Sequence, residues 1–303
     1  MRCCADWLPW LLAASCAGRT PPPPRPAPSL ATLARRAVGV RIALPDAELF
    51  VPAGYRPPAT GGVPLAIHFQ GGVRIAEENF VRMGRQGVLI ASTLAGRSGA
   101  FARPYKDPNA FRHLLAAGER ELSRHFGREL EFDDLLITSF SAGYGAVREL
   151  LKQPEFFARI EALVMADSVY ASVVADDVRA PLAEQMVDFL RFAQAAARGD
   201  KTFVLTHSAI ATDYASTAEC ADLILAAVAG RRQPSSAFTA RGVPIASEFH
   251  CRGMHVYAFA EADAGIHIDC LWMIPELVRR HCRPRDSRGQ IAPPRHGRRT
   301  SSR

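Results

Sequence analysis

Short apolar segments alternate with longer segments of helical periodicity along most of this chain. The apolar segments predict strands at residues 63–69, 87–91, 135–138, 162–166, 202–206 and 254–259. Apolar residues at helical spacing predict helices over residues 109–126, 142–151, 182–197, 217–229 and 268–280. Strands that are apolar throughout and alternate with helices are typical of a parallel sheet covered on both faces. The pattern therefore predicts an α/β fold, and in such folds functional residues gather at the carboxyl ends of the strands.

The ends of the chain differ in composition from its centre. Residues 283–303 carry six net positive charges, residues 1–36 carry four, and the remaining body carries three net negative charges. The basic character of the chain thus belongs to its ends, and a mildly acidic body does not favour a nucleic-acid partner. We predict one domain at residues 37–282, preceded by a stiff proline-rich spacer at 19–36 and followed by a disordered basic tail at 283–303.

The first 18 residues have the pattern of an export signal. Arg2 precedes a short apolar run at residues 7–14, which is followed by small residues. Two cleavage sites fit this pattern. Cleavage after Ala17 would release a protein into a secreted or periplasmic compartment, whereas cleavage before Cys16 would leave a cysteine for lipidation and membrane anchoring. We therefore expect the protein to be exported, with membrane contact only through an anchor at Cys16.

Cysteine usage agrees with export without requiring it. Outside the leader the chain has four cysteines: Cys220, Cys251, Cys270 and Cys282. An even number allows disulfides, and free buried thiols are the alternative. The spacing contains no C-x-x-C pair, so it gives little support to a zinc site.

The segment around Ser141 lies directly between a predicted strand and a predicted helix. A serine at such a turn projects its hydroxyl above the sheet edge, and small neighbours let the strand and helix backbones approach each other. Here they are Ala142, Gly143 and Gly145. The segment resembles the G-x-S-x-G nucleophile elbow of α/β-hydrolases, with Ser139 replacing the first glycine. The resemblance implies a three-layer α/β-hydrolase-like fold with Ser141 as the nucleophile.

A second segment, residues 68–72, follows the first predicted strand. It resembles the His-Gly-rich oxyanion loop of esterases and lipases. The resemblance implies that the amide of Gln70, or that of Phe69 one residue earlier, pairs with the amide of Ala142 to bind an oxyanion. His68 precedes the serine in the chain, so we expect it to fix the loop rather than act as the base.

The same resemblance implies a chain order of nucleophile, acid and histidine. His267 lies between the last strand and the last helix, which suits a general base, whereas His255 lies inside that strand. Two aspartates compete as the acid. Asp167 directly follows the strand after the nucleophile strand, and Asp213 lies several residues beyond the next strand. We favour Asp167 and keep Asp213 as the alternative.

These residues predict a serine hydrolase that cleaves an ester or amide of a small molecule or polymer through an acyl-enzyme. The chain has no Walker-type phosphate loop, no G-x-G-x-x-G after a strand and no H-E-x-x-H, so we expect neither cofactor nor metal. Residues 96–105 form a mobile-looking stretch with aromatic and arginine residues. A loop there could shape the substrate mouth, and a solvated loop is the commoner explanation. A peptidase or acyltransferase, or a catalytically silent binding protein on the same scaffold, are the alternatives.

Overall fold

A mixed sheet of ten strands forms the centre of the fold in a computed structural model, which describes residues 37–175 and 178–282. From edge to edge the strands are β1 (Gly39–Leu44), β2 (Ala47–Pro52), β4 (Val88–Ser92), β3 (Gly62–Phe69), β5 (Glu131–Phe140), β6 (Ile160–Ala166), β9 (Thr202–His207), β12 (Met254–Ala258), β11 (Ser247–Cys251) and β10 (Gln233–Pro234). The strands from β4 to β12 in this order run parallel, and antiparallel strands close both edges.

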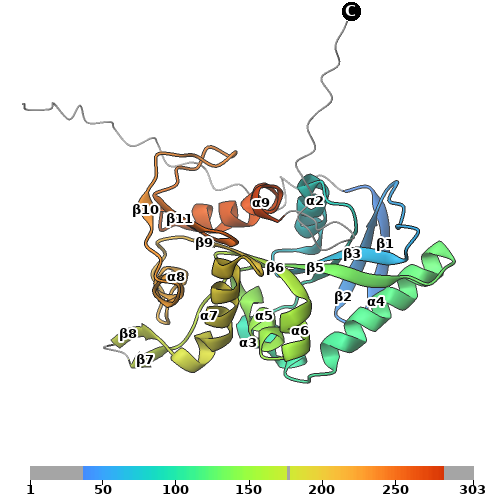
Figure 1. The fold of residues 1–303 in the computed structure, drawn as a ribbon, viewed down its shortest axis with the longest axis horizontal. Helices are drawn as coiled ribbons and strands as arrows, with labels where there is room; N and C mark the ends of the chain where they lie inside the picture. Colours follow the sequence, from blue (N-terminus) through green and yellow to red (C-terminus); the bar gives the residue numbers. More distant parts are fainter. Residues whose placement is uncertain (1–36, 176–177, 283–303) are drawn as a thin grey trace, which may run out of the picture.

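Helices cover both faces of this sheet (Figure 1). One face carries α2 (Val73–Met83) and α9 (Ala264–His281). The other carries α3 (Ser98–Tyr105), α4 (Ala110–Phe126), α5 (Tyr144–Leu151), α6 (Pro154–Arg159), α7 (Ala183–Arg198) and α8 (Thr217–Ala227). A short hairpin, β7 (Val173–Ala175) with β8 (Val178–Pro181), stands apart from the main sheet. Two separate apolar clusters fill the spaces between the sheet and its two helix layers. The predicted three-layer fold with a mostly parallel sheet is confirmed.

The predicted strands and helices all form, within a few residues at each end. Residues 96–105, which we expected to be a loop, differ from the prediction, because most of them belong to α3. This helix buries Phe101, Ala102 and Tyr105, which lie on one of its faces. It packs so closely on α5 that a Cβ at Gly145 would lie 2.2 Å from the Ser98 carbonyl oxygen. We therefore correct the expectation of a mobile stretch.

The cysteines of the described residues are all free, and three of the four are buried. The alternative of buried thiols therefore holds there, and no disulfide joins Cys220, Cys251, Cys270 or Cys282. The export signal with Cys16, the proline-rich spacer and the basic tail lie outside the described residues. Within residues 37–175 and 178–282, no helix has the length and hydrophobicity needed to cross a bilayer.

Candidate active site

The carboxyl ends of neighbouring parallel strands bring the predicted residues to one edge of the sheet. Ser141 follows β5, and Asp167 follows β6. The two strands are in register, with Phe140 paired to Ala166, so both residues leave the sheet at the same level. His267 lies in the first turn of α9, which follows β12. Helices and further strands separate these elements along the chain, so the site is assembled from segments far apart in sequence.

The Ser141 backbone adopts an unusual conformation at the turn out of β5. Its φ is 49°, in the left-handed region that costs a non-glycine residue about 1–2 kcal/mol. A single 3₁₀ turn, η1 (Ser141–Gly143), then leads into α5. Strained residues of this kind are frequent at active sites, where the surrounding structure holds them in place. The turn is the one that the resemblance to a nucleophile elbow implied.

Gly143 is required by the close approach of strand β3 to this turn. A Cβ at position 143 would lie 2.4 Å from the carbonyl oxygen of Phe69 and 2.7 Å from the Ser139 hydroxyl. Both atoms are buried, so neither can move away without disturbing the sheet. The second glycine of the motif thus has a steric reason in this chain.

Substitution of Gly143 by alanine is expected to destabilise the protein and move the Ser141 turn. Forcing an extra carbon into a packed site typically costs about 1–3 kcal/mol. We expect a lower free energy of unfolding in urea together with reduced activity of the folded protein. Gly99→Ala is the matched control, because nothing lies within 4 Å of a Cβ there. Equal stability of the two variants would contradict the steric account.

Asp167 and His267 are joined by a hydrogen bond. The imidazole Nδ1 lies 2.7 Å from the carboxylate Oδ2. Because a carboxylate only accepts, Nδ1 carries the proton and donates it to Asp167. In a neutral imidazole Nε2 is then unprotonated and free to accept a proton. The histidine is therefore held in the tautomer that a general base needs.

The Asp167 carboxylate is fully buried and accepts three further hydrogen bonds. They come from the Ser208 amide at 3.1 Å, the Ser208 hydroxyl at 2.8 Å and the Thr217 hydroxyl. Burial alone would raise the pKa of Asp167, but these bonds and the one from His267 outweigh burial and lower it. The group therefore stays charged at neutral pH and can stabilise a protonated His267.

Ser208 and Thr217 differ in how far the sequence points to them. Ser208 directly follows the strand β9, so its position predicts that it lines the site or orders the acid. Thr217 is the first residue of α8, next to the helix cap Ser216, and nothing local in the sequence indicates its contact with Asp167. That contact arises because β9 lies beside β6 in the sheet.

Asp213, the alternative acid, is not part of this arrangement. It is exposed on the loop that precedes α8. The pKa of the nearby Arg179 is raised mainly by its hydrogen bond to Glu219, and the charge of Asp213 adds only a lesser contribution. Among the described residues, no hydrogen bond joins Asp213 to His267. Between the two candidates, the structure brings only Asp167 to the histidine.

Phe140 places His267 next to the Ser141 turn. Its ring centroid lies 4.4 Å from that of the imidazole, and it directly precedes Ser141. No hydrogen bond between the Ser141 hydroxyl and His267 occurs in the part of the chain that the structure describes. Such bonds are often long before substrate binds and tighten in the complex.

The oxyanion loop requires a correction. The amide of Gln70 donates to the Ser92 carbonyl oxygen at 3.1 Å, so it extends the sheet between β3 and β4 and is not available to a substrate. Phe69, the alternative, is the last residue of β3 and pairs with strands on both sides. Ala142 lies in η1, half-buried at the start of the helical segment. Gly71, with φ 107°, is the next residue whose amide could serve the site.

His68 has the structural role that its place in the chain implied. Its Nδ1 lies 2.8 Å from the Thr138 hydroxyl, which itself donates to the Ile67 carbonyl oxygen. The ring is buried and joins β3 to β5. Burial lowers the pKa of His68 to about 4, so it stays neutral and does not approach Ser141 as a base.

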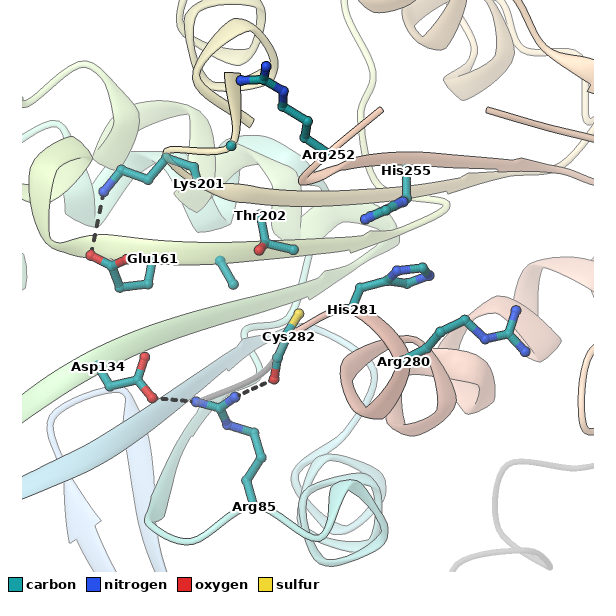
Figure 2. Close-up of a pocket in the computed structure, with 12 residues that line it drawn as sticks. Arg85, Asp134, Glu161, Lys201, Thr202, Arg252, His255, Arg280, His281 and Cys282 are labelled. Carbon is teal, nitrogen blue, oxygen red and sulfur yellow. Dashed lines mark hydrogen bonds and ion pairs between the residues drawn. The ribbon is translucent and has the colours of Figure 1, made fainter. Parts of the chain in front are cut away.

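A cavity of about 280 Å³ lies at the opposite edge of the sheet (Figure 2). Thr202, the first residue of β9, is on its wall, which places it at the amino ends of the parallel strands. Within it the rings of His255 and His281 stack with centroids 3.8 Å apart. This cavity is remote from the Ser141 edge, and we assign it no part in the chemistry.

Those two histidines are expected to make the fold less stable in mild acid. Burial and neighbouring histidine charges lower the pKa of His255 to about 4 and that of His281 to about 3. Free histidine in the unfolded chain titrates near 6.5, so the unfolded state binds more protons below that pH. The free energy of unfolding, measured in urea, should fall between pH 7 and pH 5. His255→Leu should flatten this dependence and His113→Gln, at an exposed position, should not; equal slopes would contradict the prediction.

Comparison with known proteins gives only distant structural similarity. No protein-family model and no curated protein matches the chain. Among solved structures it is similar to the acylaminoacyl peptidase of Pyrococcus horikoshii, with 9% identity, a TM-score of 0.43, and 81% of this chain and 41% of the other covered. For the ferric enterobactin esterase of Salmonella typhimurium the values are 11%, 0.42, 75% and 54%. For a puromycin-hydrolyzing peptidase of Mycobacterium tuberculosis they are 14%, 0.42, 80% and 38%.

The chain spans between 38% and 54% of the length of these three proteins. At such identities and TM-scores, their activities say nothing about the reaction of this chain. Its function has to be inferred from the residues at the carboxyl edge of the sheet.

Proposed function

We propose that the protein is a serine hydrolase that cleaves a carboxyl ester through an acyl-enzyme intermediate. The observation that carries the proposal is the hydrogen bond from His267 Nδ1 to the buried Asp167, at the sheet edge where Ser141 occupies a left-handed turn. A buried charge is costly unless it is paired and hydrogen-bonded. Here its partners orient an imidazole beside a serine.

In the proposed reaction the Ser141 hydroxyl attacks the ester carbonyl carbon while His267 Nε2 takes its proton. Asp167 stabilises the imidazolium that forms. As the tetrahedral intermediate collapses, His267 returns the proton to the leaving alcohol, and an acyl group remains on Ser141. Water, deprotonated by the same Nε2, then attacks the acyl carbon, and the carboxylic acid leaves as Ser141 regains its proton.

Two backbone amides are proposed to bind the oxygen that becomes negative in this reaction. Ala142 supplies one from the start of the helical segment, where free amides favour negative charge. We assign the second to Gly71, whose amide has no acceptor among the described residues. Gly71 lies against Phe140, the residue before the nucleophile, because a Cβ at position 71 would be 3.3 Å from that ring.

The substrate is proposed to be a small-molecule or polymer ester outside the cytoplasm. This follows from the export pattern of the first 18 residues, with or without an anchor at Cys16. Amide bonds and acyl transfer to another acceptor would use the same residues. Comparison of an ester with an amide of the same acyl group separates hydrolysis of the two bonds.

A fluorophosphonate probe tests the proposal. It reacts with activated serines, so we expect labelling of the native protein and none of Ser141→Ala. Ser123→Ala removes a serine on α4, far from the site, and should label like the wild type. Absence of labelling in folded wild-type protein would contradict the proposal and favour a silent scaffold that binds a partner.

A further inference from the structure

A chain of buried hydroxyl groups connects the nucleophile turn to the turn that carries the acid. The Ser139 hydroxyl lies 2.7 Å from the Ser168 hydroxyl. The Ser168 hydroxyl lies 2.8 Å from the backbone carbonyl oxygen of Ser141. Both serine residues are inaccessible to solvent. The three residues therefore form one continuous set of contacts beneath the site.

The direction of these hydrogen bonds follows from the number of hydrogen atoms. The Ser141 carbonyl can only accept, so Ser168 donates its single hydroxyl hydrogen to it. Ser139 must then donate to the Ser168 oxygen. The order is Ser139 to Ser168 to Ser141, and donation from Ser139 polarises the Ser168 hydroxyl and strengthens the second bond.

This chain joins two strained turns. Ser141 and Asp167 both have left-handed backbones, with φ of 49° and 45°. Ser168 directly follows Asp167, so its bond to the Ser141 carbonyl fixes the acid-bearing turn against the nucleophile turn. His267 is hydrogen-bonded to Asp167, and hence the chain also sets where the imidazole stands relative to Ser141.

We infer that Ser168 and Ser139 are positioning residues that hold Ser141 and the Asp167–His267 pair in their reactive arrangement. The nucleophile-elbow motif that this segment resembles has glycine at the position of Ser139, and the serine is then a functional feature of this chain. A glycine there would fit sterically but would leave Ser168 without its donor. The inference rests on the proposed function, because it concerns the geometry of the same site.

The test is the rate of fluorophosphonate labelling and the kcat and KM for a 4-nitrophenyl ester, each normalised to folded protein. Ser168→Ala removes both bonds and should lower kcat and the labelling rate by about 10²-fold, as expected for misplaced reacting groups, with KM little changed. Ser139→Ala and Ser139→Gly keep the bond from Ser168 to Ser141 and should lose less. Ser139→Ala/Ser168→Ala should equal Ser168→Ala, because loss of Ser168 already disconnects Ser139.

Ser123→Ala is the matched control. It also deletes a hydroxyl bonded to a backbone carbonyl, that of Leu130, but on α4. It should retain the wild-type kcat per folded molecule. A purely structural role for Ser168 would lower the thermal midpoint and leave kcat per folded molecule unchanged, and this result would overturn the inference. So would a Ser139→Gly variant as active as the wild type, or additive losses in the double variant.

Failure of the proposed function gives a different result. In that case the wild-type protein itself shows no Ser141-dependent labelling. If the wild type is labelled at Ser141 and Ser168→Ala is labelled at the same rate, the hydrolase proposal stands and the positioning role is refuted.

Discussion

Replacement of Ser141 by alanine is expected to lower ester turnover by about 10⁴- to 10⁶-fold, as removal of the nucleophile does in serine hydrolases. Alanine has no hydroxyl to attack the carbonyl, and the remaining amides and histidine cannot form an acyl-enzyme. The fold should persist, since alanine removes only one oxygen from a half-buried position. The measurement is kcat/KM for a 4-nitrophenyl ester, after unfolding curves show that both proteins are folded.

The control for this prediction is Ser123→Ala, which should leave kcat/KM near the wild-type value. If the Ser141→Ala protein keeps most of its esterase activity, Ser141 is not the nucleophile of the reaction. Contaminating esterases are excluded if the residual activity per milligram of protein stays constant during further purification and co-elutes with the protein from a sizing column.

Asp167→Asn is the second large effect that we expect, a fall in kcat of about 10⁴-fold. The amide group has nearly the shape of the carboxylate, but its NH₂ group donates where Oδ2 accepted. It would then face His267 Nδ1 with a hydrogen, and the imidazole would have to carry its own proton on Nε2 instead. An Nε2 that already holds a proton cannot take one from Ser141.

Asp213→Asn is the matched control for that change. This aspartate is exposed, and among the described residues the hydrogen-bonded carboxylate partner of His267 is Asp167. Its substitution should leave kcat unchanged, since surface changes away from a site are usually neutral. The opposite pattern, with Asp213→Asn inactive and Asp167→Asn active, would mean that our account assigns the acid role to the wrong aspartate.

Much of the parallel sheet could be predicted because its strands are apolar on both faces. The segment Val88–Ser92, for example, is buried at every position, and such a run has few alternatives to a central strand. Edge elements lack this signal. The hairpin of β1 and β2 and the antiparallel β11 show no regular alternation of buried and exposed residues, and the sequence pattern did not reveal them.

The site was predictable to the extent that it depends on chain order and strand ends. Ser141, Asp167 and His267 each stand next to an apolar strand or between elements that the pattern identifies. The amides of the loop at residues 68–72 could not be assigned in this way. The sequence there indicates a glycine-rich turn, but it does not indicate at which residue the hydrogen bonding of the strand ends. The sheet includes the Gln70 amide, one residue further than the apolar run indicates.

The role of Ser139 could not be predicted either. Its sequence position marks only a departure from a glycine, and its partner Ser168 lies 29 residues away in the turn that follows β6. Such a contact depends on the register of β5 against β6, which local periodicity does not determine.

A crystal structure of the protein after reaction with a fluorophosphonate tests the central claim most directly. The account predicts phosphorus bonded to the Ser141 oxygen, with His267 Nε2 within about 3 Å of that oxygen and the phosphoryl oxygen facing the Ala142 amide. Phosphorus on another residue, or an imidazole turned away from Ser141 while still bonded to Asp167, would contradict it.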